Sequence, residues 1–368
     1  MKSVAVIFGG ESVEREVSIL TALEVMAYLS RDYEVVPIYV DGRGWWVDKG
    51  IDKLEFFKRG SIPKDRVYIE GVRLYKRGAF GSLKLYKQID VVYLMTHGGS
   101  GENGDIQGLL NMHKVAFTSC DTLASAICMD KYLLKKCLKS IGVPTLPATL
   151  YEGEDMLGFC EEVEKKYGYP LIVKPVTLGS SIGISVARDR ESLVEGIERA
   201  SLFDTRVMVE RYLEQKVELN QSAYMGDKLR LSMIERPISK DGMLTFWDKY
   251  GGDVKSMSGS MREMPANIDS KLSAKINAIS TKVYKELSLK GIVRIDYLYS
   301  SEYGIYLNEI NTIPGSMALY LYGDRDKWSD ILDETVRYAY TYKLRKDSVT
   351  RDFGCDLLHS HSKGVKNS

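Results

Sequence analysis

Two short apolar runs, each closed by a pair of glycines, constrain the fold of this chain most strongly. The first is Val4–Phe8, followed by Gly9-Gly10, and the second is Ile89–Met95, followed by Thr96-His97-Gly98-Gly99. Unbroken apolar runs of this length are typical of strands buried on both faces. Between the two runs, a helical pattern over 13–27 and a strand-like run over 33–40 give the order strand, helix, strand. We therefore predict an open α/β sheet, whose ligands bind beyond the carboxyl ends of its strands.

Two residues with reactive side chains lie just beyond the glycine pairs. Glu14 follows the first pair, with Ser12 expected as the N-cap of the helix, and His97 precedes the second pair. The segment from His97 to Gly104 contains too many glycines for a helix or a strand, so we expect a shaped loop. This loop is either part of a ligand site or a tight turn in which the histidine is a cap.

The composition excludes several functional classes. The chain of 368 residues has 51 Lys plus Arg against 50 Asp plus Glu, a net charge of +1, which gives no electrostatic reason to expect a nucleic acid or membrane partner. No apolar run approaches the roughly eighteen residues of a membrane span, and Val4–Phe8 is too short for a signal-peptide core. Five cysteines without a CxxC pair indicate reduced thiols in a cytoplasm. The chain has four histidines, which leaves few ligands for a zinc cluster. The functional classes that remain are a cytoplasmic enzyme and a cytoplasmic binding protein.

A predicted hairpin near the C-terminus carries the sharpest chemical signal. Strands over 291–300 and 305–311 place Arg294 and Asp296 on one face, and Glu309 and Asn311 on one face of the next strand. Carboxylate and amide oxygens are ligands that Mg²⁺ accepts, and an arginine beside them can stabilise a transferring phosphoryl group. The alternative is a solvent-facing strand pair with a salt bridge.

Two lysines are candidates for phosphate contacts. Lys174 ends an apolar strand before the Gly/Ser turn 178–183, and Lys131 begins an amphipathic helix. A lysine beside a turn of backbone N–H donors can hold phosphate oxygens, although a plain hairpin has the same composition. Glu210 and Glu218 can accept hydrogen bonds from a nucleotide, or they are surface charges.

The pattern of elements predicts three domains and a tail. We expect an N-terminal α/β domain over 1–121 with an insertion of short strands at 41–88, a central subdomain over 122–207 and a C-terminal subdomain over 208–347. The Gly- and Ser-rich segment 239–262 is predicted to be a mobile lid loop that orders over bound substrate, and 348–368 a disordered tail.

In this order, the segments resemble the D-alanine–D-alanine ligase family of ATP-grasp enzymes, in particular the branch with the vancomycin-resistance ligases. The resemblance covers roughly residues 1–345 and rests on the stretches 9–18, 97–108, Met129-Asp-Lys131, Val173-Lys-Pro175, 178–183, Arg294-Ile-Asp296 and 308–315. It implies an α/β protein, α+β in its C-terminal half, in which an ATP-grasp fold follows an open parallel-sheet domain. It also implies a cytoplasmic homodimer that acts on ATP and D-amino acids.

The implied reaction has two steps: ATP phosphorylates the D-alanine carboxylate, and the amine of a second D-amino acid then displaces the phosphate. The residues that the resemblance assigns to the donor and to transfer are Glu14, His97, Ser180, Tyr250 and Arg294. Those it assigns to ATP are Lys131, Lys174, Ser180, Ser181, Glu210, Leu213, Glu218 and Lys249. Two Mg²⁺ ions, or Mn²⁺ in their place, would be held by Asp296, Glu309 and Asn311. The acceptor residues would be Lys249, Gly315 and Tyr320.

The chain departs from the family pattern around the second substrate. Tyr320 stands where the family usually has the serine that receives the acceptor carboxylate, and the lid before Lys249-Tyr250 is shorter. Because there is no histidine between His113 and His359, the lid provides no imidazolium to favour a hydroxyl acceptor. We expect D-alanine as acceptor, with D-serine next and D-lactate after it; an inactive nucleotide-binding regulator is the alternative from another class.

Overall fold

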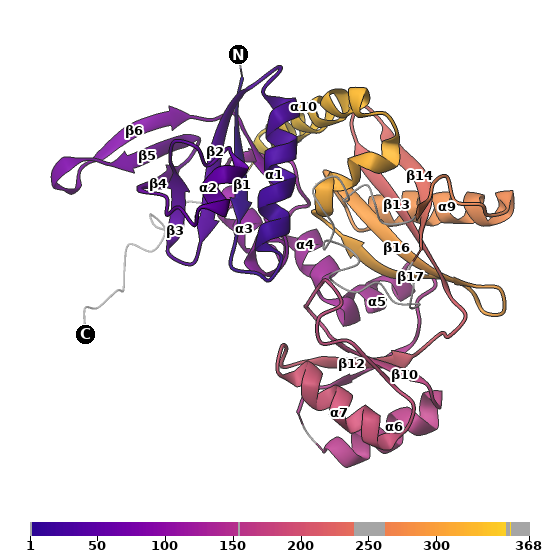
Figure 1. The fold of residues 1–368 in the computed structure, drawn as a ribbon. Coiled ribbons are helices and arrows are strands. Elements are labelled where there is room, and N and C mark those ends of the chain that lie inside the picture. Colours follow the sequence, from indigo (N-terminus) through magenta and orange to yellow (C-terminus); the bar gives the residue numbers. More distant parts are fainter. Residues whose placement is uncertain (1, 154, 239–261, 351–353, 355–368) are drawn as a thin grey trace.

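The computed structural model describes residues 2–153, 155–238, 262–350 and 354. Within these residues the strands form sheets of eight, four and five strands. Figure 1 shows the eight-stranded sheet at one end of the molecule, the four-stranded sheet at the bottom and the five-stranded sheet beside both. The predicted α/β class and the open parallel-sheet N-terminal domain are confirmed.

The first sheet is a parallel core extended by an antiparallel ribbon. Its parallel strands, in spatial order, are β2 (Glu34–Asp41), β1 (Ser3–Gly9), β7 (Val91–Leu94) and β8 (Ala116–Phe117). The ribbon continues from β2 through β3 (Gly44–Val47), β4 (Asp65–Glu70), β5 (Arg73–Arg77) and β6 (Leu83–Gln88). The open sheet and the short strands expected within 41–88 are both present. Short helices α2 (Leu54–Lys58) and α3 (Asp105–Met112) lie in its connections.

Helix α1 (Arg15–Leu29) is tied to the carboxyl ends of β1 and β7. The hydroxyl of Ser18 accepts from the Gly9 N–H and donates to the Met95 carbonyl, both at 2.7 Å. The expected N-cap at Ser12 is wrong, because the helix begins at Arg15. Ser12 instead accepts from the Glu14 N–H at 3.1 Å and donates to the His97 carbonyl, so it joins the two glycine-containing loops.

The central sheet is antiparallel and lies against two helices. In spatial order its strands are β11 (Ser185–Ala187), β10 (Leu171–Pro175), β12 (Val207–Arg211) and β9 (Ala148–Tyr151). Apolar residues of these strands pack on α6 (Met156–Tyr167) and α7 (Arg190–Ser201), and a capping box at Asp189 and Ser192 starts α7. The predicted boundary between 207 and 208 falls at the first residue of β12; the domain boundaries stay predictions.

The third sheet carries the predicted hairpin. Its strands, in spatial order, are β15 (Arg262–Glu263), β14 (Leu229–Pro237), β13 (Val217–Met225), β16 (Ile292–Ser300) and β17 (Gly304–Asn311). Helices α4 (Thr122–Met129), α5 (Lys131–Ser140) and α9 (Ser270–Glu286) contribute to one apolar core with it. The chain then forms the 3₁₀ segment η3 (Gly315–Tyr322) and the long helix α10 (Trp328–Asp347).

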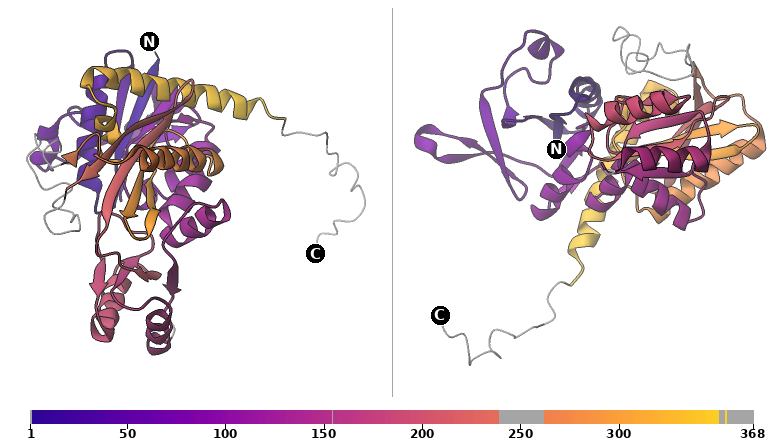
Figure 2. Two further views of the ribbon diagram at one scale, coloured as in Figure 1. Left: turned by 90° about the vertical axis from the view of Figure 1, so that its right-hand side faces the viewer. Right: turned by 90° about the horizontal axis from the view of Figure 1, so that it is seen from below.

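Helix α10 joins the first and third sheets, and both views in Figure 2 show it running along the molecule. The Thr335 hydroxyl lies 3.0 Å from the Tyr93 hydroxyl of β7, while Glu334 accepts from the Tyr224 hydroxyl of β13 at 3.1 Å. One helix therefore fixes the two sheets relative to each other.

Some sequence-based predictions fall outside the described residues. The lid 239–262 does so except for Arg262, and so does the tail except for residues 348–350 and 354. Across the residues that are described, no helix is long and apolar enough to cross a membrane.

We predict that Gly291→Ala destabilises the fold strongly. Gly291 has φ +65°, and a Cβ there would lie 1.9 Å from the Thr118 carbonyl oxygen at the end of β8. Gly304→Ala is the control, since Gly304 has φ +86° with nothing within 4 Å, which isolates a backbone cost of about 1–2 kcal/mol. We expect Gly291→Ala to cost roughly 3 kcal/mol or more, seen as a larger loss of thermal stability. Equal losses for the two variants would contradict the close approach.

Candidate active site

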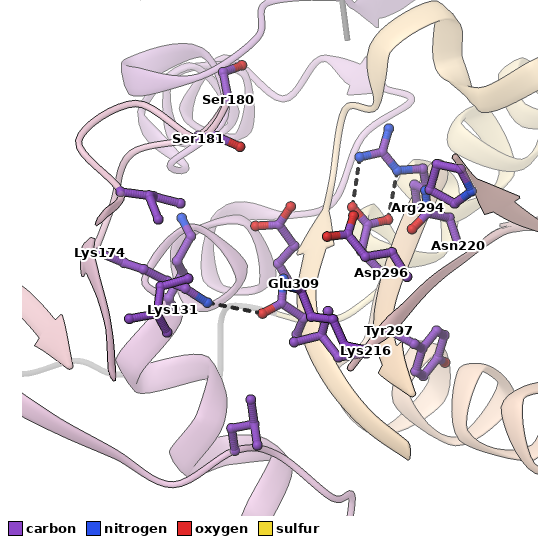
Figure 3. Close-up of a pocket in the computed structure, with 18 of the residues that line it drawn as sticks. Lys131, Lys174, Ser180, Ser181, Lys216, Asn220, Arg294, Asp296, Tyr297 and Glu309 are labelled. Atoms are coloured by element: carbon purple, nitrogen blue, oxygen red, sulfur yellow. Dashed lines mark hydrogen bonds and ion pairs between the residues drawn. The ribbon is translucent and has the colours of Figure 1, made fainter. Parts of the chain in front are cut away.

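A large pocket lies between the central and C-terminal sheets. Its walls come from α5, β10, the turn 178–181, β12, β13, β16, β17 and η3 (Figure 3). A smaller pocket adjoins it, lined by the loops after β1 and β7 and by 309–315. The two pockets share Lys131, Gly179, Arg294, Glu309 and Gly315. A reaction between groups bound in the two pockets would take place at these shared residues.

The register of β16 and β17 brings the predicted polar residues together. Arg294 pairs with Asn311, and Asp296 pairs with Glu309. The Arg294 guanidinium donates to both Asp296 oxygens at 2.7 and 2.8 Å, and the Asn311 amide donates to Asp296 at 3.1 Å. The Arg294 and Asp296 side chains are 16% and 13% exposed, so the alternative of a solvent-facing salt bridge is excluded.

The two predicted lysines are buried in the same pocket. The Lys131 ammonium donates to the Leu178 carbonyl at 2.6 Å, at the start of the Gly/Ser turn. Lys174 contacts the Glu210 carboxylate and lies 3.3 Å from the Asn308 side-chain oxygen. A bulge after Asp296 leaves Asn308 out of the ladder, which allows this contact between β10 and β17.

Glu210 is fully buried between two lysines, one of which sequence reasoning missed. One of its oxygens contacts Lys174, and the other lies 2.7 Å from the Lys135 ammonium. Burial raises the pKa of Glu210, but the charges of Lys135 and Lys174 outweigh it and lower the pKa to about 2. Burial lowers the pKa of Lys135. The sequence did contain an indication that Lys135 lies beside Lys131, because the two lysines are four residues apart and therefore share one face of α5.

The nucleotide residues implied by the resemblance line the large pocket. Ser181, Leu213 and Glu218 all do so, and Leu213 packs with Leu146 and Leu298 in a small apolar cluster. The pocket therefore has an apolar wall beside Glu218 and a cationic end at the buried lysines.

At the smaller pocket, Glu14 meets the Gly/Ser turn. The Ser180 hydroxyl donates to the Glu14 carboxylate, which also lies against Gly98 and Gly179. A Cβ on Gly98 would come within 2.6 Å of the Glu14 carboxylate, and Gly98 has φ +66°, so this position requires glycine. Tyr250, the third member implied for this set, lies outside the described residues, as does Lys249.

His97 is held as a neutral imidazole. Its Nδ1 lies 2.6 Å from the Ile313 carbonyl oxygen, which only accepts, so Nδ1 carries the hydrogen. Burial lowers the pKa of His97, and the neighbouring Glu14 charge opposes this only in part. The histidine therefore links the loop after β7 to the segment after β17 without a charge of its own.

Glu102 is a second residue that sequence reasoning did not single out. Its carboxylate accepts from the backbone N–H groups of Gly98, Thr312 and Ile313 at 3.1, 2.9 and 3.0 Å. Burial and the Glu14 charge raise the pKa of Glu102 to about 7. One carboxylate thus ties the glycine loop to the end of β17.

Tyr320 of η3 also lines the large pocket and lies in a polar cluster. Its hydroxyl donates to Glu235 at 2.9 Å, and the Arg262 guanidinium lies 4.3 Å from its ring centre. Glu235 also accepts from Asn220 at 3.1 Å and lies 3.4 Å from Arg262. None of these three neighbours was singled out from the sequence. Gly315 lines both pockets at the start of the same segment.

The predicted metal ligands include only two carboxylates. No group of three or more His, Cys, Asp or Glu in the described part of the chain has a metal-binding arrangement. A cation here would take its remaining oxygens from Asn311, water and phosphate, as Mg²⁺ commonly does.

The central and C-terminal sheets around the large pocket form the predicted ATP-grasp architecture, and the open-sheet domain precedes them. This arrangement is typical of a class of ATP-dependent ligases. Two family models match: D-ala D-ala ligase N-terminus over residues 3–120 and D-ala D-ala ligase C-terminus over residues 137–326. The chain belongs to the D-alanine–D-alanine ligase family, as the sequence resemblance predicted.

Individual relatives agree with this membership. A D-alanine–D-alanine ligase of Thermosipho melanesiensis is 36% identical over 91% of this chain and 93% of its own. The solved D-alanine–D-alanine ligase of Helicobacter pylori is 25% identical, with a TM-score of 0.75 over 92% of this chain and 98% of its own. The solved VanG D-Ala:D-Ser ligase of Enterococcus faecalis is 26% identical, with a TM-score of 0.77 over 92% of this chain and 99% of its own.

The raised pKa of Glu102 predicts a pH-dependent stability. Between pH 4.5 and about 7 the folded protein keeps the Glu102 proton that the unfolded chain has lost, so the free energy of unfolding falls as pH rises. The accumulated loss is up to about 3 kcal/mol. Glu102→Gln does not titrate, so its melting temperature, measured without Mg²⁺, should rise relative to wild type from pH 5 to 8. A constant difference across that range would disprove the raised pKa.

Proposed function

We propose that this chain is an ATP-dependent, ADP-forming ligase that joins two D-alanines into D-alanyl-D-alanine for peptidoglycan precursors. The observation that carries the proposal is the pair of adjoining pockets, which meet at Lys131, Arg294 and Glu309. The larger pocket has the apolar wall and buried cations that suit a nucleotide. The smaller one has Glu14, which suits an ammonium group.

In the first step, the donor D-alanine carboxylate attacks the γ-phosphorus of ATP, and ADP leaves. We assign Glu14, positioned by Ser180, to the donor ammonium, and Lys131 and Lys174 to phosphate oxygens. Arg294 would stabilise the charge of the transferring phosphoryl group. Neutral His97 lines the donor pocket, and we assign it a position near the reacting carboxyl group. Glu210, whose oxygens are both engaged by lysines, would act by positioning Lys174.

The residues at the end of the hairpin fit a hard divalent cation. Asp296 and Glu309 are cross-strand neighbours, and Asn311 donates its amide hydrogen to Asp296, which leaves its carbonyl oxygen as the ligand atom. We propose that these three residues hold two Mg²⁺ ions, or Mn²⁺ in their place. Ions bound at these residues would neutralise the negative charge of the ATP phosphates.

In the second step, the amine of the acceptor attacks the acyl carbon, the dipeptide bond forms and inorganic phosphate leaves. Curated relatives named for D-alanine–D-alanine ligation support D-alanine as acceptor. The complete set Arg294, Asp296, Glu309 and Asn311 disfavours an inactive regulator, because binding alone does not need it. We also propose that the enzyme acts in the cytoplasm as a homodimer.

The test is ADP release with D-alanine, followed by the mass of the product. We expect release that depends on D-alanine and a product with the mass of the dipeptide. An acceptor panel of D-alanine, D-serine and D-lactate at neutral pH should rank in that order. Nucleotide binding without ADP formation would overturn the proposal in favour of a regulator, and preferential use of D-lactate would overturn the acceptor assignment.

We predict that Glu309→Gln lowers kcat by at least about 100-fold, because it removes one of the two negative charges that would hold the cations. Glu302→Gln is the matched control, since Glu302 lies exposed in the turn of the same hairpin. ADP release at saturating substrates measures both, and unchanged melting temperatures check the fold. Near wild-type turnover of Glu309→Gln at ordinary Mg²⁺ would contradict the ligand assignment.

A further inference from the structure

The carboxylate of the acceptor needs a partner that the described contacts of Tyr320 do not provide. A phenol has a single O–H donor, and that of Tyr320 is given to Glu235 at 2.9 Å. Burial, and next the Glu235 charge, raise the pKa of Tyr320, so the phenol keeps this proton. The expectation that Tyr320 receives the acceptor carboxylate is therefore at odds with the hydrogen bond it makes.

Six described cationic side chains line the large pocket: Lys131, Lys174, Arg211, Lys216, Arg262 and Arg294. The Arg211 guanidinium lies 5.1 Å from the ring centre of Tyr303, and the Lys216 ammonium lies 4.3 Å from the ring centre of Tyr212. Lys174 contacts Glu210, and Lys131 donates to the Leu178 carbonyl, both toward the central sheet. Arg294 is engaged by both oxygens of Asp296. Arg262 lies against Tyr320 of η3, and its side chain, which is 17% exposed, lines the pocket.

We propose that Arg262 binds the carboxylate of the second amino acid, and that Tyr320 and Glu235 hold its guanidinium in place. This inference rests on the proposed function, since it names a specificity residue of that reaction. It makes Arg262 a determinant of specificity for acceptors that carry a carboxylate.

The surroundings of Arg262 suit this role. The Tyr320 ring lies 4.3 Å beneath the guanidinium, a distance at which cation and ring attract and the plane of the guanidinium is fixed. The contact to Glu235 is long, at 3.4 Å, and Glu235 shares its charge with Tyr320 and Asn220. A guanidinium has five N–H donors in a planar fork, so a contact to Glu235 is compatible with a two-point contact to a carboxylate.

The experiment compares acceptors with and without a carboxylate on the full-length enzyme. The donor is D-alanine, and the acceptors are D-alanine, D-alaninamide and hydroxylamine, which traps the acyl phosphate as a hydroxamate. We expect Arg262→Gln to raise the D-alanine acceptor KM roughly 10- to 100-fold, the usual range for loss of a charge-assisted contact. Hydroxamate formation and the KM for D-alaninamide should change less than about threefold, because neither acceptor carries a carboxylate.

Two further variants complete the test. Arg236→Gln is the matched control, because Arg236 lies on the same strand pair but contacts Glu263 at 4.0 Å and is 48% exposed. Tyr320→Phe keeps the ring and removes the hydroxyl, so it should raise the acceptor KM less than Arg262→Gln does. If Arg262→Gln does not fold, a rise of the D-alanine KM of tenfold or more in Tyr320→Phe would still overturn the role of Arg262, because it would assign the carboxylate to the phenol.

The outcomes separate the inference from the function it rests on. Three outcomes would overturn the role of Arg262 while ligation persists. In Arg262→Gln, the KM could rise alike for all three acceptors, or the D-alanine KM could stay unchanged. In Tyr320→Phe, the D-alanine KM could rise as much as in Arg262→Gln. Absence of hydroxamate from the wild-type enzyme would overturn the proposed function itself.

Discussion

The antiparallel register of β16 and β17 is the constraint on which the site depends. It places Arg294, Asp296, Glu309 and Asn311 toward the pocket and buries Ile295 and Ile310 on the other side. A slip of one residue would exchange the two faces. It would remove about 1.5–3 kcal/mol of burial per isoleucine and place charges in the core. The same apolar packing that forms the C-terminal core therefore fixes the polar groups of the site.

Contacts between distant segments then bring the other groups to this hairpin. Glu102 binds the backbone after β17, His97 binds the Ile313 carbonyl, and Ser180 reaches Glu14 from the central sheet. Helix α10 holds the first and third sheets together through Tyr93 and Tyr224. The donor pocket is consequently shared among all three sheets, so a shift of the first sheet relative to the other two would alter the donor pocket and leave the two sheets around the large pocket in place.

Local patterns were sufficient for part of this arrangement. The period of two in the hairpin predicted which side chains of 294–311 converge, and the glycine pairs predicted where Glu14 and His97 lie. The spacing of Lys131 and Lys135 placed both lysines on one face of α5, but it did not predict that Lys135 pairs with Glu210. Nor was the contact of Glu102 with the backbone of Thr312 predictable, because the two residues lie 210 positions apart in the sequence. Ser12 was misassigned because its hydroxyl bonds a loop 85 residues away rather than its own helix. Tyr320 was identified from the sequence as a departure from the family pattern. Its partner Arg262 was not identified, because it follows a segment without a regular pattern. Assignments on 239–261 and on the tail remain predictions.

The central claim is that these groups activate a carboxylate as an acyl phosphate, and an isotope experiment tests it most directly. D-alanine labelled with ¹⁸O in both carboxylate oxygens is turned over with ATP, and the released phosphate is analysed by mass spectrometry. Because the carboxylate oxygen that attacks phosphorus stays with it when the amine attacks carbon, the account predicts one ¹⁸O in each phosphate formed. Unlabelled phosphate accompanied by dipeptide would contradict the account.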